Sequence, residues 1–202
     1  MGRCQVKIVD HEERKNAILR KALPLFAIMG YEQVTYEQLA KVCGLSRTAL
    51  YKYFENKKDI FDNALYHLVQ RIGNALKETL GQNPAMTAAE RLEMLAKMSI
   101  DMCVENPELL QTVIEYLLAQ KRQGESVERK IRRHTVTFRC EIKNMVQYGI
   151  ASGEFRQVSP IRFADMFFSL IQAAVIRIVF YDDADKDHLI VQCKTLIDSI
   201  KV

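Results

Sequence analysis

The stretch TYEQLAKVCGLSRTALYKYF, residues 35–54, has the pattern of two short helices joined by a tight turn. A capping box begins at Thr35, whose hydroxyl and the glutamine three residues later can satisfy the free N–H groups of a helix start. Gly44 suits the turn, and Ser46 is of a residue type that commonly caps a second helix. The sequence therefore predicts a helix-turn-helix unit. Its predicted helices are 36–42 and 47–53.

The side chains of this unit divide into an apolar set and a polar set. The apolar set is expected to hold the two helices together and comprises Leu39, Ala40, Val42, Leu45, Leu50 and Phe54. The polar set carries hydrogen-bond donors on the first and outer turns of the second helix and just beyond it. Its members are Arg47, Thr48, Tyr51, Lys52, Tyr53 and Lys57.

The polar set has the chemistry of a surface that reads double-stranded DNA. A recognition helix places its N-terminal residues at base edges in the major groove, while flanking groups contact phosphates. Arg47 can bind a guanine edge with two hydrogen bonds, and Thr48 can contact a base or a thymine methyl group. The two tyrosine hydroxyls and the two lysines suit phosphate oxygens. We therefore expect DNA contacts from this set.

The distribution of charge favours the same kind of partner. Residues 1–60 carry eleven Lys and Arg against seven Asp and Glu, whereas residues 61–202 carry eighteen of each. A positive excess confined to the first third of the chain indicates an anionic partner there. A helix-turn-helix shape is also a common way to pack helices, so packing roles for Tyr51 and Tyr53 stay open.

The rest of the chain also has helical patterns from end to end. No alternation of apolar and polar residues bounded by turns predicts a strand, and only four Pro and eight Gly occur, which favours long helices. We therefore expect an all-α fold of about nine helices. They are predicted near 11–29, 36–42, 47–53, 57–80, 88–104, 107–122, 126–151, 160–180 and 186–200.

Several classes of protein lack support in the sequence. The five cysteines are scattered and none has the spacing of a zinc site, so we expect reduced thiols and no metal. Phosphate-binding glycine loops and nucleophile motifs are missing, so we expect no enzyme activity and no cofactor. No apolar leader opens the chain, and charged residues interrupt the apolar stretch 161–181. A cytoplasmic location without membrane insertion is expected.

Two segments near the end of the sequence carry more apolar surface than the chain itself can cover. Segment 160–180 is apolar nearly all round, and segment 186–200 carries an apolar stripe. A helix that is apolar on every side must be covered on both faces. We therefore expect a second copy of the chain to pack against these helices. The predicted interface residues are Phe168, Ile171, Val175, Cys193 and Ile197.

A ligand cavity is a further prediction for the last two thirds of the chain. Three methionines recur at steps of four on one helix, and another helix carries a mostly apolar stripe with one histidine. Methionine adapts to irregular shapes, so such a lining suits a flexible apolar ligand. Core packing is the simpler interpretation of each residue, and both interpretations stay open. The candidate lining residues are Met94, Met98, Met102, Tyr116, His134 and Phe138.

The first third of the chain resembles the N-terminal domain of the TetR family of transcriptional regulators. The matching residues are Ile18-Leu19, Leu25-Phe26, Gly30-Tyr31, Val34-Thr35, Leu39-Ala40, Gly44-Leu45-Ser46, Leu50-Tyr51-x-Tyr53-Phe54 and Lys57. The resemblance implies operator contacts from Thr35, Ser46, Arg47, Thr48, Tyr51, Tyr53 and Lys57. Two positions depart from the family. Cys43 replaces a small residue, and Pro24 lies in the first helix, where it removes a hydrogen bond and is expected to cause a kink.

The same resemblance implies an all-helical dimer whose last two helices pair with their copies as a four-helix bundle. Such a dimer presents two recognition helices to a palindromic operator. The family is usually released from DNA by a small molecule, and repression is its default outcome. An apolar effector of unknown identity is therefore expected to be a second partner.

Two domains follow from these predictions, a helix-turn-helix domain at 1–56 and an effector-binding and dimerisation domain at 57–202. The expected function is that of a sequence-specific transcriptional regulator, a dimeric repressor released by a ligand. Helix 57–80 joins the domains, so we expect the ligand to tilt it and change the spacing of the DNA-reading heads. A helical, dimeric interaction module that does not read DNA is the alternative.

Overall fold

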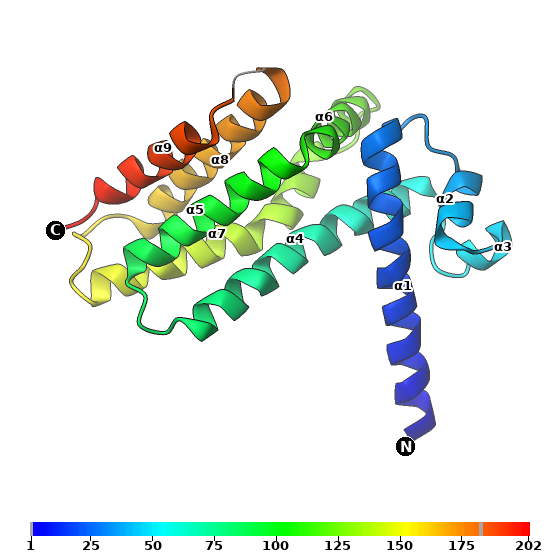
Figure 1. Ribbon diagram of the computed structural model, residues 1–202, viewed down its shortest axis with the longest axis horizontal. Helices are drawn as coiled ribbons and strands as arrows, with labels where there is room; N and C mark the ends of the chain where they lie inside the picture. Colours follow the sequence, from blue (N-terminus) through cyan, green and yellow to red (C-terminus); the bar gives the residue numbers. More distant parts are fainter. Residues whose placement is uncertain (1, 182–183) are drawn as a thin grey trace. The chain divides into compact units, whose positions relative to one another are not determined.

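A computed structural model describes residues 2–181 and 184–202, apart from the side chains of residues 2–10, 72, 133 and 134. These described residues form nine α-helices and no β-sheet, with one isolated antiparallel bridge (Figure 1). The predicted all-α fold is thereby confirmed. The helices are α1 (Gly2–Met29), α2 (Tyr36–Cys43), α3 (Arg47–Leu50), α4 (Lys57–Gln82), α5 (Ala88–Glu105), α6 (Pro107–Arg122), α7 (Val127–Ala151), α8 (Pro160–Phe180) and α9 (Lys186–Asp198).

The first helix is longer than predicted and is not interrupted at Pro24. Proline leaves the carbonyl of the residue four positions earlier without its helical donor. Because Pro24 lies on the exposed side of α1, water can satisfy that carbonyl. The helix ends instead at Met29, because the next residue, Gly30, adopts a left-handed φ of 76° that favours glycine.

Packing divides the chain into two compact units. The first unit comprises Met1–Gln70 and Gln111–Glu125, and the second comprises Arg71–Leu110 and Ser126–Val202. Each unit is therefore built from two separate segments of sequence. The predicted boundary at residue 56 divides the chain by function rather than by packing, and it stays a prediction.

The core of the first unit is a cluster of aromatic rings. The centroids of Phe26 and Phe61 lie 4.8 Å apart, and those of Tyr31 and Tyr116 lie 4.5 Å apart. The Tyr116 hydroxyl donates a hydrogen bond of 2.8 Å to the Asp62 carboxylate, and burial together with this contact raises the pKa of Tyr116. These contacts bind the second half of α6 to α1 and α4.

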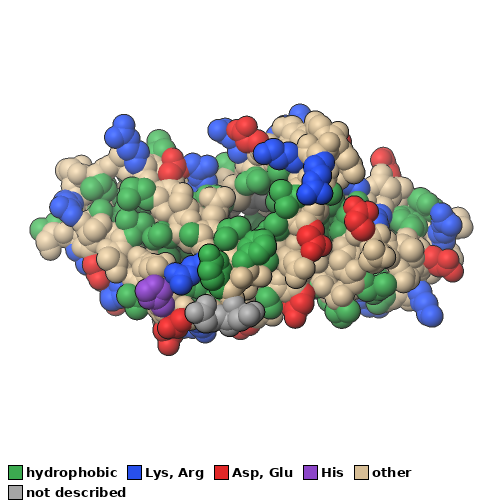
Figure 2. Space-filling model, turned by 90° about the horizontal axis from the view of Figure 1, so that it is seen from above, with side chains coloured by type: hydrophobic (Ala, Val, Ile, Leu, Met, Phe, Trp, Pro, Cys, Tyr) green, Lys and Arg blue, Asp and Glu red, His purple; other side chains and the backbone are tan. Residues whose placement is uncertain are grey.

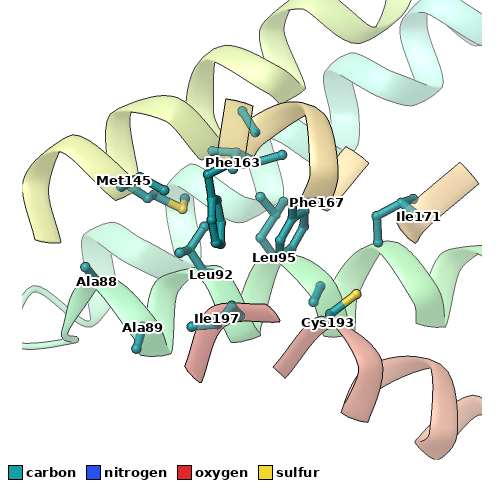
Figure 3. Packing of buried hydrophobic residues seen from close by; sticks show 14 of the residues in the cluster. Ala88, Ala89, Leu92, Leu95, Met145, Phe163, Phe167, Ile171, Cys193 and Ile197 are labelled. Atoms are coloured by element: carbon teal, nitrogen blue, oxygen red, sulfur yellow. The ribbon is translucent and has the colours of Figure 1, made fainter. Parts of the chain in front are cut away.

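The second unit is organised around α5, which packs along α9 and also contacts α7 and α8. Leu92 and Leu95 of α5 are buried and lie beside Phe163 and Phe167 of α8 (Figure 3). Ile197 of α9 closes the cluster from the other side. Burial of such large side chains supplies most of the stability of a helical unit of this size.

The start of α5 is capped from two directions. The Thr87 hydroxyl accepts from the N–H of Glu90, and the Glu90 carboxylate accepts from the N–H of Thr87 at 2.8 Å. The Glu154 carboxylate accepts from the N–H groups of Ala88 and Ala89 at 2.7 and 2.8 Å. Four N–H groups at this helix start are thus satisfied, two of them by a residue from beyond α7.

Replacing Glu154 with glutamine is expected to lower the free energy of unfolding by about 1–3 kcal/mol. The amide keeps the size of the side chain but turns an NH₂ group toward an N–H group of a buried helix start. Urea unfolding followed by circular dichroism measures the change. Glu78→Gln, at an exposed position of α4, is the control and is expected to change stability by less than about 0.5 kcal/mol. Equal effects of the two changes would contradict the capping role.

A side chain lies very close to the backbone in the last turn of α7. The buried ring of Phe155 lies against Gly149, where a β-carbon would stand 2.2 Å from the Cδ2 atom of that ring. The same β-carbon would lie 2.8 Å from the β-carbon of Ala88. Phe155 also bridges to Lys201, so the C-terminal end of the chain is bound to this turn. Only glycine at 149 leaves room for this arrangement.

Candidate DNA-binding site

A side-chain hydroxyl caps the start of each helix of the helix-turn-helix unit. The Thr35 hydroxyl accepts from the N–H of Gln38 at 3.2 Å, and the Gln38 side chain accepts from the N–H of Thr35 at 2.8 Å. The Ser46 hydroxyl accepts from the N–H of Ala49 at 3.1 Å. The predicted caps of α2 and α3 are therefore present, and both hydroxyl-bearing residues remain exposed.

The turn between α2 and α3 depends on one glycine. Gly44 adopts φ 68° and ψ 34°, a left-handed conformation that costs other residues free energy. The N–H of Leu45 then donates to the carbonyl of Ala40 at 2.9 Å, which closes the end of α2. This geometry fixes the direction in which α3 leaves the turn.

The recognition helix is shorter than predicted. α3 ends at Leu50, and Lys52 and Tyr53 continue in tighter turns, with hydrogen bonds from their N–H groups to the carbonyls of Ala49 and Leu50. The predicted helix 47–53 is wrong in its last three residues. The cause is Phe54, which must turn inward to a buried position right after the helix.

A stack of side chains stands beside the start of α3. The rings of Tyr36 and Tyr51 lie 4.3 Å apart at an interplanar angle of 21°, and the Arg47 guanidinium lies over the Tyr51 ring at 5.9 Å. The Tyr36 hydroxyl donates to the carbonyl of Phe54 at 2.7 Å. Burial, followed by the nearby Tyr51 hydroxyl, raises the pKa of Tyr36 to about 12, so this donor keeps its proton.

Sequence reasoning missed Tyr36. The residue holds Tyr51 in place from below, and Tyr51 in turn limits the freedom of Arg47, whose Nη2 atom lies 3.5 Å from the Tyr51 hydroxyl. No spacing rule distinguishes a tyrosine at the first position of α2 from an ordinary exposed residue. The signal exists only in three dimensions.

The eight predicted DNA contacts fall into two groups in the structure. Thr35, Ser46, Arg47, Thr48, Tyr51 and Lys52 are exposed. Tyr53 is half-buried, with its ring stacked on His11 at 4.9 Å. Lys57 is half-buried, and its ammonium group donates to the carbonyls of Tyr31 and Glu32 at 2.8 and 3.1 Å. The first group can reach a ligand without rearrangement.

The predicted ligand-lining residues do not all belong to one unit. Met94 and Met98 are half-buried and pack against the core of the second unit, and Phe138 lies in the same unit. Tyr116 belongs to the aromatic core of the first unit. The side chain of His134 lies outside the described ones. A pocket formed by these residues stays a prediction.

A groove of about 290 Å³ does occur on the second unit, between α7 and α8. None of the predicted ligand-lining residues whose side chains the structure describes is among those that line it. Arg139 in the groove forms an ion pair with Asp165. The residues lining the groove are Arg132, Thr135, Val136, Arg139, Cys140, Lys143, Ile161, Ala164 and Asp165.

The predicted interface residues lie mostly inside the second unit. Ile171, Cys193 and Ile197 are buried in its core, so they offer no surface to a partner in this conformation. Phe168 and Val175 are half-buried. The apolar surface that the prediction requires lies on neighbouring positions of α8. On the face shown in Figure 2, hydrophobic side chains gather at the surface among charged ones.

Comparison with known proteins identifies relatives along most of the chain. The profile of the family described as bacterial regulatory proteins, tetR family, matches residues 18–64. The uncharacterized HTH-type transcriptional regulator YhgD of Bacillus subtilis (strain 168) is 24% identical over 184 residues, which are 87% of this chain and 86% of YhgD.

Solved structures share the fold. A TetR transcription regulator from Haloarcula marismortui ATCC 43049 has a TM-score of 0.80 at 21% identity and covers 95% of this chain and 100% of that one. The regulator FadR from Bacillus subtilis, solved in complex with stearoyl-CoA, has a TM-score of 0.72 at 21% identity, with 90% and 95% covered. The profile match contains the whole helix-turn-helix unit with its exposed donors. Residues 18–64 therefore form a DNA-binding domain of the tetR family of bacterial regulatory proteins, and the chain is a DNA-binding transcriptional regulator of the tetR type.

Proposed function

We propose that this regulator is a homodimeric repressor that binds a palindromic operator and leaves it when a small apolar effector binds. The repressor acts in the cytoplasm and catalyses no reaction. Arg47 and Thr48 contact base edges. The residues that bind the phosphate backbone are Thr35, Ser46, Tyr51, Lys52, Tyr53 and Lys57.

One observation carries this proposal, the pre-ordered position of Arg47. Its guanidinium stands over Tyr51, and Tyr51 is stacked on Tyr36, whose hydroxyl is bound to the backbone. An arginine that is already restricted loses less side-chain entropy when it binds a guanine edge. Thr48, next to it, is exposed as well. This arrangement supports base reading rather than packing as the role of the α3 surface.

A stripe on the outer face of α8 supports the homodimer. Only 28% of the most apolar stretch of α8 is buried within the single chain, although the helix is long and apolar enough to span a membrane. The exposed residues on one side of α8 recur at steps of three and four positions, which is the spacing of a seam along which two helices pack. The residues at the centre of this seam are small. A second copy of α8 can cover this seam. The stripe consists of Met166, Ser169, Ala173, Ile176 and Phe180.

Replacing Ile176 with glutamate is expected to convert the dimer into monomers at micromolar concentration. Ile176 is 47% exposed in the single chain, so the charge is tolerated there but not between two copies of α8. Sedimentation velocity measures the change. Val104→Glu, at an exposed apolar position of α5, is the control and should remain dimeric. A dimeric Ile176→Glu variant would place the interface elsewhere.

The effector is proposed to bind in the second unit. The solved relative FadR holds stearoyl-CoA, and a long apolar chain suits the flexible methionines Met94, Met98 and Met102. Phe138 and His134 would complete the lining. The coupling free energy needed to release DNA is typically about 1–3 kcal/mol.

Selection of bound sequences from a random duplex pool at two salt concentrations tests the proposal. A two-fold symmetric motif whose affinity falls steeply with salt is the expected result. Binding without a motif would reduce the interaction to backbone attraction. Absence of binding, in protein that mass spectrometry shows to be free of ligand, would contradict operator recognition.

A further inference from the structure

The groove between α7 and α8 joins exposed apolar side chains to an excess of positive charge. Two of its apolar residues, Val136 and Ile161, are 54% and 62% exposed. Apolar side chains that line a hollow together with a few charged groups are the usual composition of a small-molecule site. The charged residues of the groove are three cations and one anion, namely Arg132, Arg139, Lys143 and Asp165.

The arrangement of α7 and α8 places these residues in order along the groove. The two helices are joined by the short segment 152–159 and lie side by side as antiparallel neighbours (Figure 1). Arg139 of α7 forms an ion pair with Asp165 of α8. Lys143 comes about one helical turn after Arg139, and Ile161 comes about one turn before Asp165. Lys143 and Ile161 therefore lie at the same end of the groove.

The guanidinium group of Arg139 is held in place while several of its donors remain free for a ligand. Its Nη2 atom donates to the Asp165 carboxylate, and its carbon lies 5.9 Å from the centre of the Phe168 ring. A guanidinium group carries five N–H donors in a rigid fork, and this ion pair uses only one nitrogen. A side chain that is already restricted loses less entropy when it binds a ligand.

The charges of the groove leave one cation without compensation. Asp165 compensates Arg139, and the Glu128 carboxylate lies 3.2 Å from the Nε atom of Arg132. Lys143 is half-buried, and none of the described residues forms an ion pair with its ammonium group. Because Arg139 and Lys143 are four residues apart on one helix, their side chains are neighbours. A single negative charge bound by both of them would complete the balance.

We propose that this groove binds a small amphipathic carboxylate, whose head contacts Lys143 and Arg139 and whose apolar body covers Val136 and Ile161. A carboxylate is flat and singly charged, so it matches both the guanidinium fork and the one uncompensated cation. The volume of about 290 Å³ lies at the lower end for small-molecule sites, which favours a body of about eight carbons or one ring.

The groove is separate from the two other sites proposed for the second unit. It shares no described residue with the methionine-rich lining proposed for the effector, and none with the α8 stripe proposed for the dimer. The inference therefore goes beyond the proposed function and depends neither on operator binding nor on release by an effector. It adds a second ligand site to the same chain.

Cys140 reports the occupancy of the groove in the wild-type protein, because it lines the groove and is an exposed free thiol. Alkylation by the neutral reagent iodoacetamide, followed by peptide mass spectrometry, gives the rate at this residue. Octanoate is expected to slow the reaction about tenfold when its concentration is ten times its Kd. Octanamide, which lacks the charge, and acetate, which lacks the apolar body, should give no protection. Cys43, half-buried in the first unit, is the internal control and should react equally fast with and without octanoate.

Lys143→Met tests the proposed contact with the carboxylate head. The substitution removes the ammonium group and keeps most of the stem, so the Kd for octanoate is expected to rise about tenfold. Lys121→Met, at an exposed position of α6, is the matched control and should leave the Kd unchanged. Isothermal titration calorimetry measures both values, and circular dichroism checks that both variants are folded.

Several results would overturn the inference. Octanoate that fails to protect Cys140, or an unchanged Kd in Lys143→Met, would remove the carboxylate from the groove. Equal protection by octanamide would show that only the apolar wall binds. A Cys140 thiol that barely reacts without octanoate, and that reacts faster on dilution, would show that a second copy of the chain covers the groove. All of these measurements use protein without DNA, so a failure of operator binding would leave them unaffected.

Discussion

Replacing Gly149 with alanine is expected to lower the free energy of unfolding by about 2–3 kcal/mol. The new β-carbon would stand 2.2 Å from one ring atom of Phe155 and 2.8 Å from the β-carbon of Ala88. Either α7 moves away from the start of α5 or the Phe155 ring leaves the core, and each response costs about 2–3 kcal/mol. Greater helix propensity of alanine offsets at most about 1 kcal/mol.

The control for this change is Gly73→Ala. Gly73 also lies within a helix, and a β-carbon there would meet no atom within 4 Å. Alanine at this position is therefore expected to raise the free energy of unfolding by up to about 1 kcal/mol. Urea unfolding followed by circular dichroism compares both variants with the wild-type protein. Equal effects of the two substitutions would show that α7 does not need the close approach.

Replacing Arg47 with alanine is expected to weaken binding to the selected operator by about 10- to 100-fold, because a bidentate contact to guanine is worth about 1–3 kcal/mol. The loss on an unrelated duplex should be only a few-fold, since there the arginine contributes charge alone. Fluorescence anisotropy with both duplexes at the same salt concentration measures the two losses.

Two companion variants separate the charge of Arg47 from its donor geometry and from the support that Tyr36 gives it. Arg47→Lys keeps the charge and loses the planar pair of donors, so it should bind unrelated DNA normally and the operator weakly. Tyr36→Phe keeps the ring under Tyr51 but removes the bond to the Phe54 carbonyl, so a smaller loss is expected. Equal weakening of both duplexes by Arg47→Ala would remove base reading from the role of this residue.

The helical elements were predictable because their signals are local. Thr35, Ser46 and Thr87 each satisfy the N–H group three residues later, so the caps depend only on nearby sequence. Gly44 likewise announces a left-handed turn. The end of α3 was missed because it is decided by the inward turn of Phe54 toward a core that local sequence does not reveal.

The sequence predicted which side chains of the site can donate hydrogen bonds, but not how those side chains are arranged. Exposed positions such as Arg47 and Lys52 follow from helix periodicity, whereas the occupied ammonium of Lys57 depends on carbonyls about 25 residues earlier. The role of Glu154 at the start of α5 depends on a separation of more than 60 residues. Periodicity predicted that α8 is apolar on more than one face, but it cannot say which of these faces the rest of the same chain covers. Ile171 proved to be internal for that reason.

The division of each unit between two segments has a consequence for synthesis on the ribosome. The aromatic core of the first unit includes Tyr116, so the rings of Phe26, Tyr31 and Phe61 lack their last neighbour until that residue leaves the exit tunnel. Chains emerge from the N-terminus at about 5–20 residues per second, so the nascent helix-turn-helix must wait several seconds for completion. During that interval its exposed rings are a natural target for chaperones. A fragment that ends at residue 56 would carry the same exposed surface permanently, and it should aggregate rather than bind DNA.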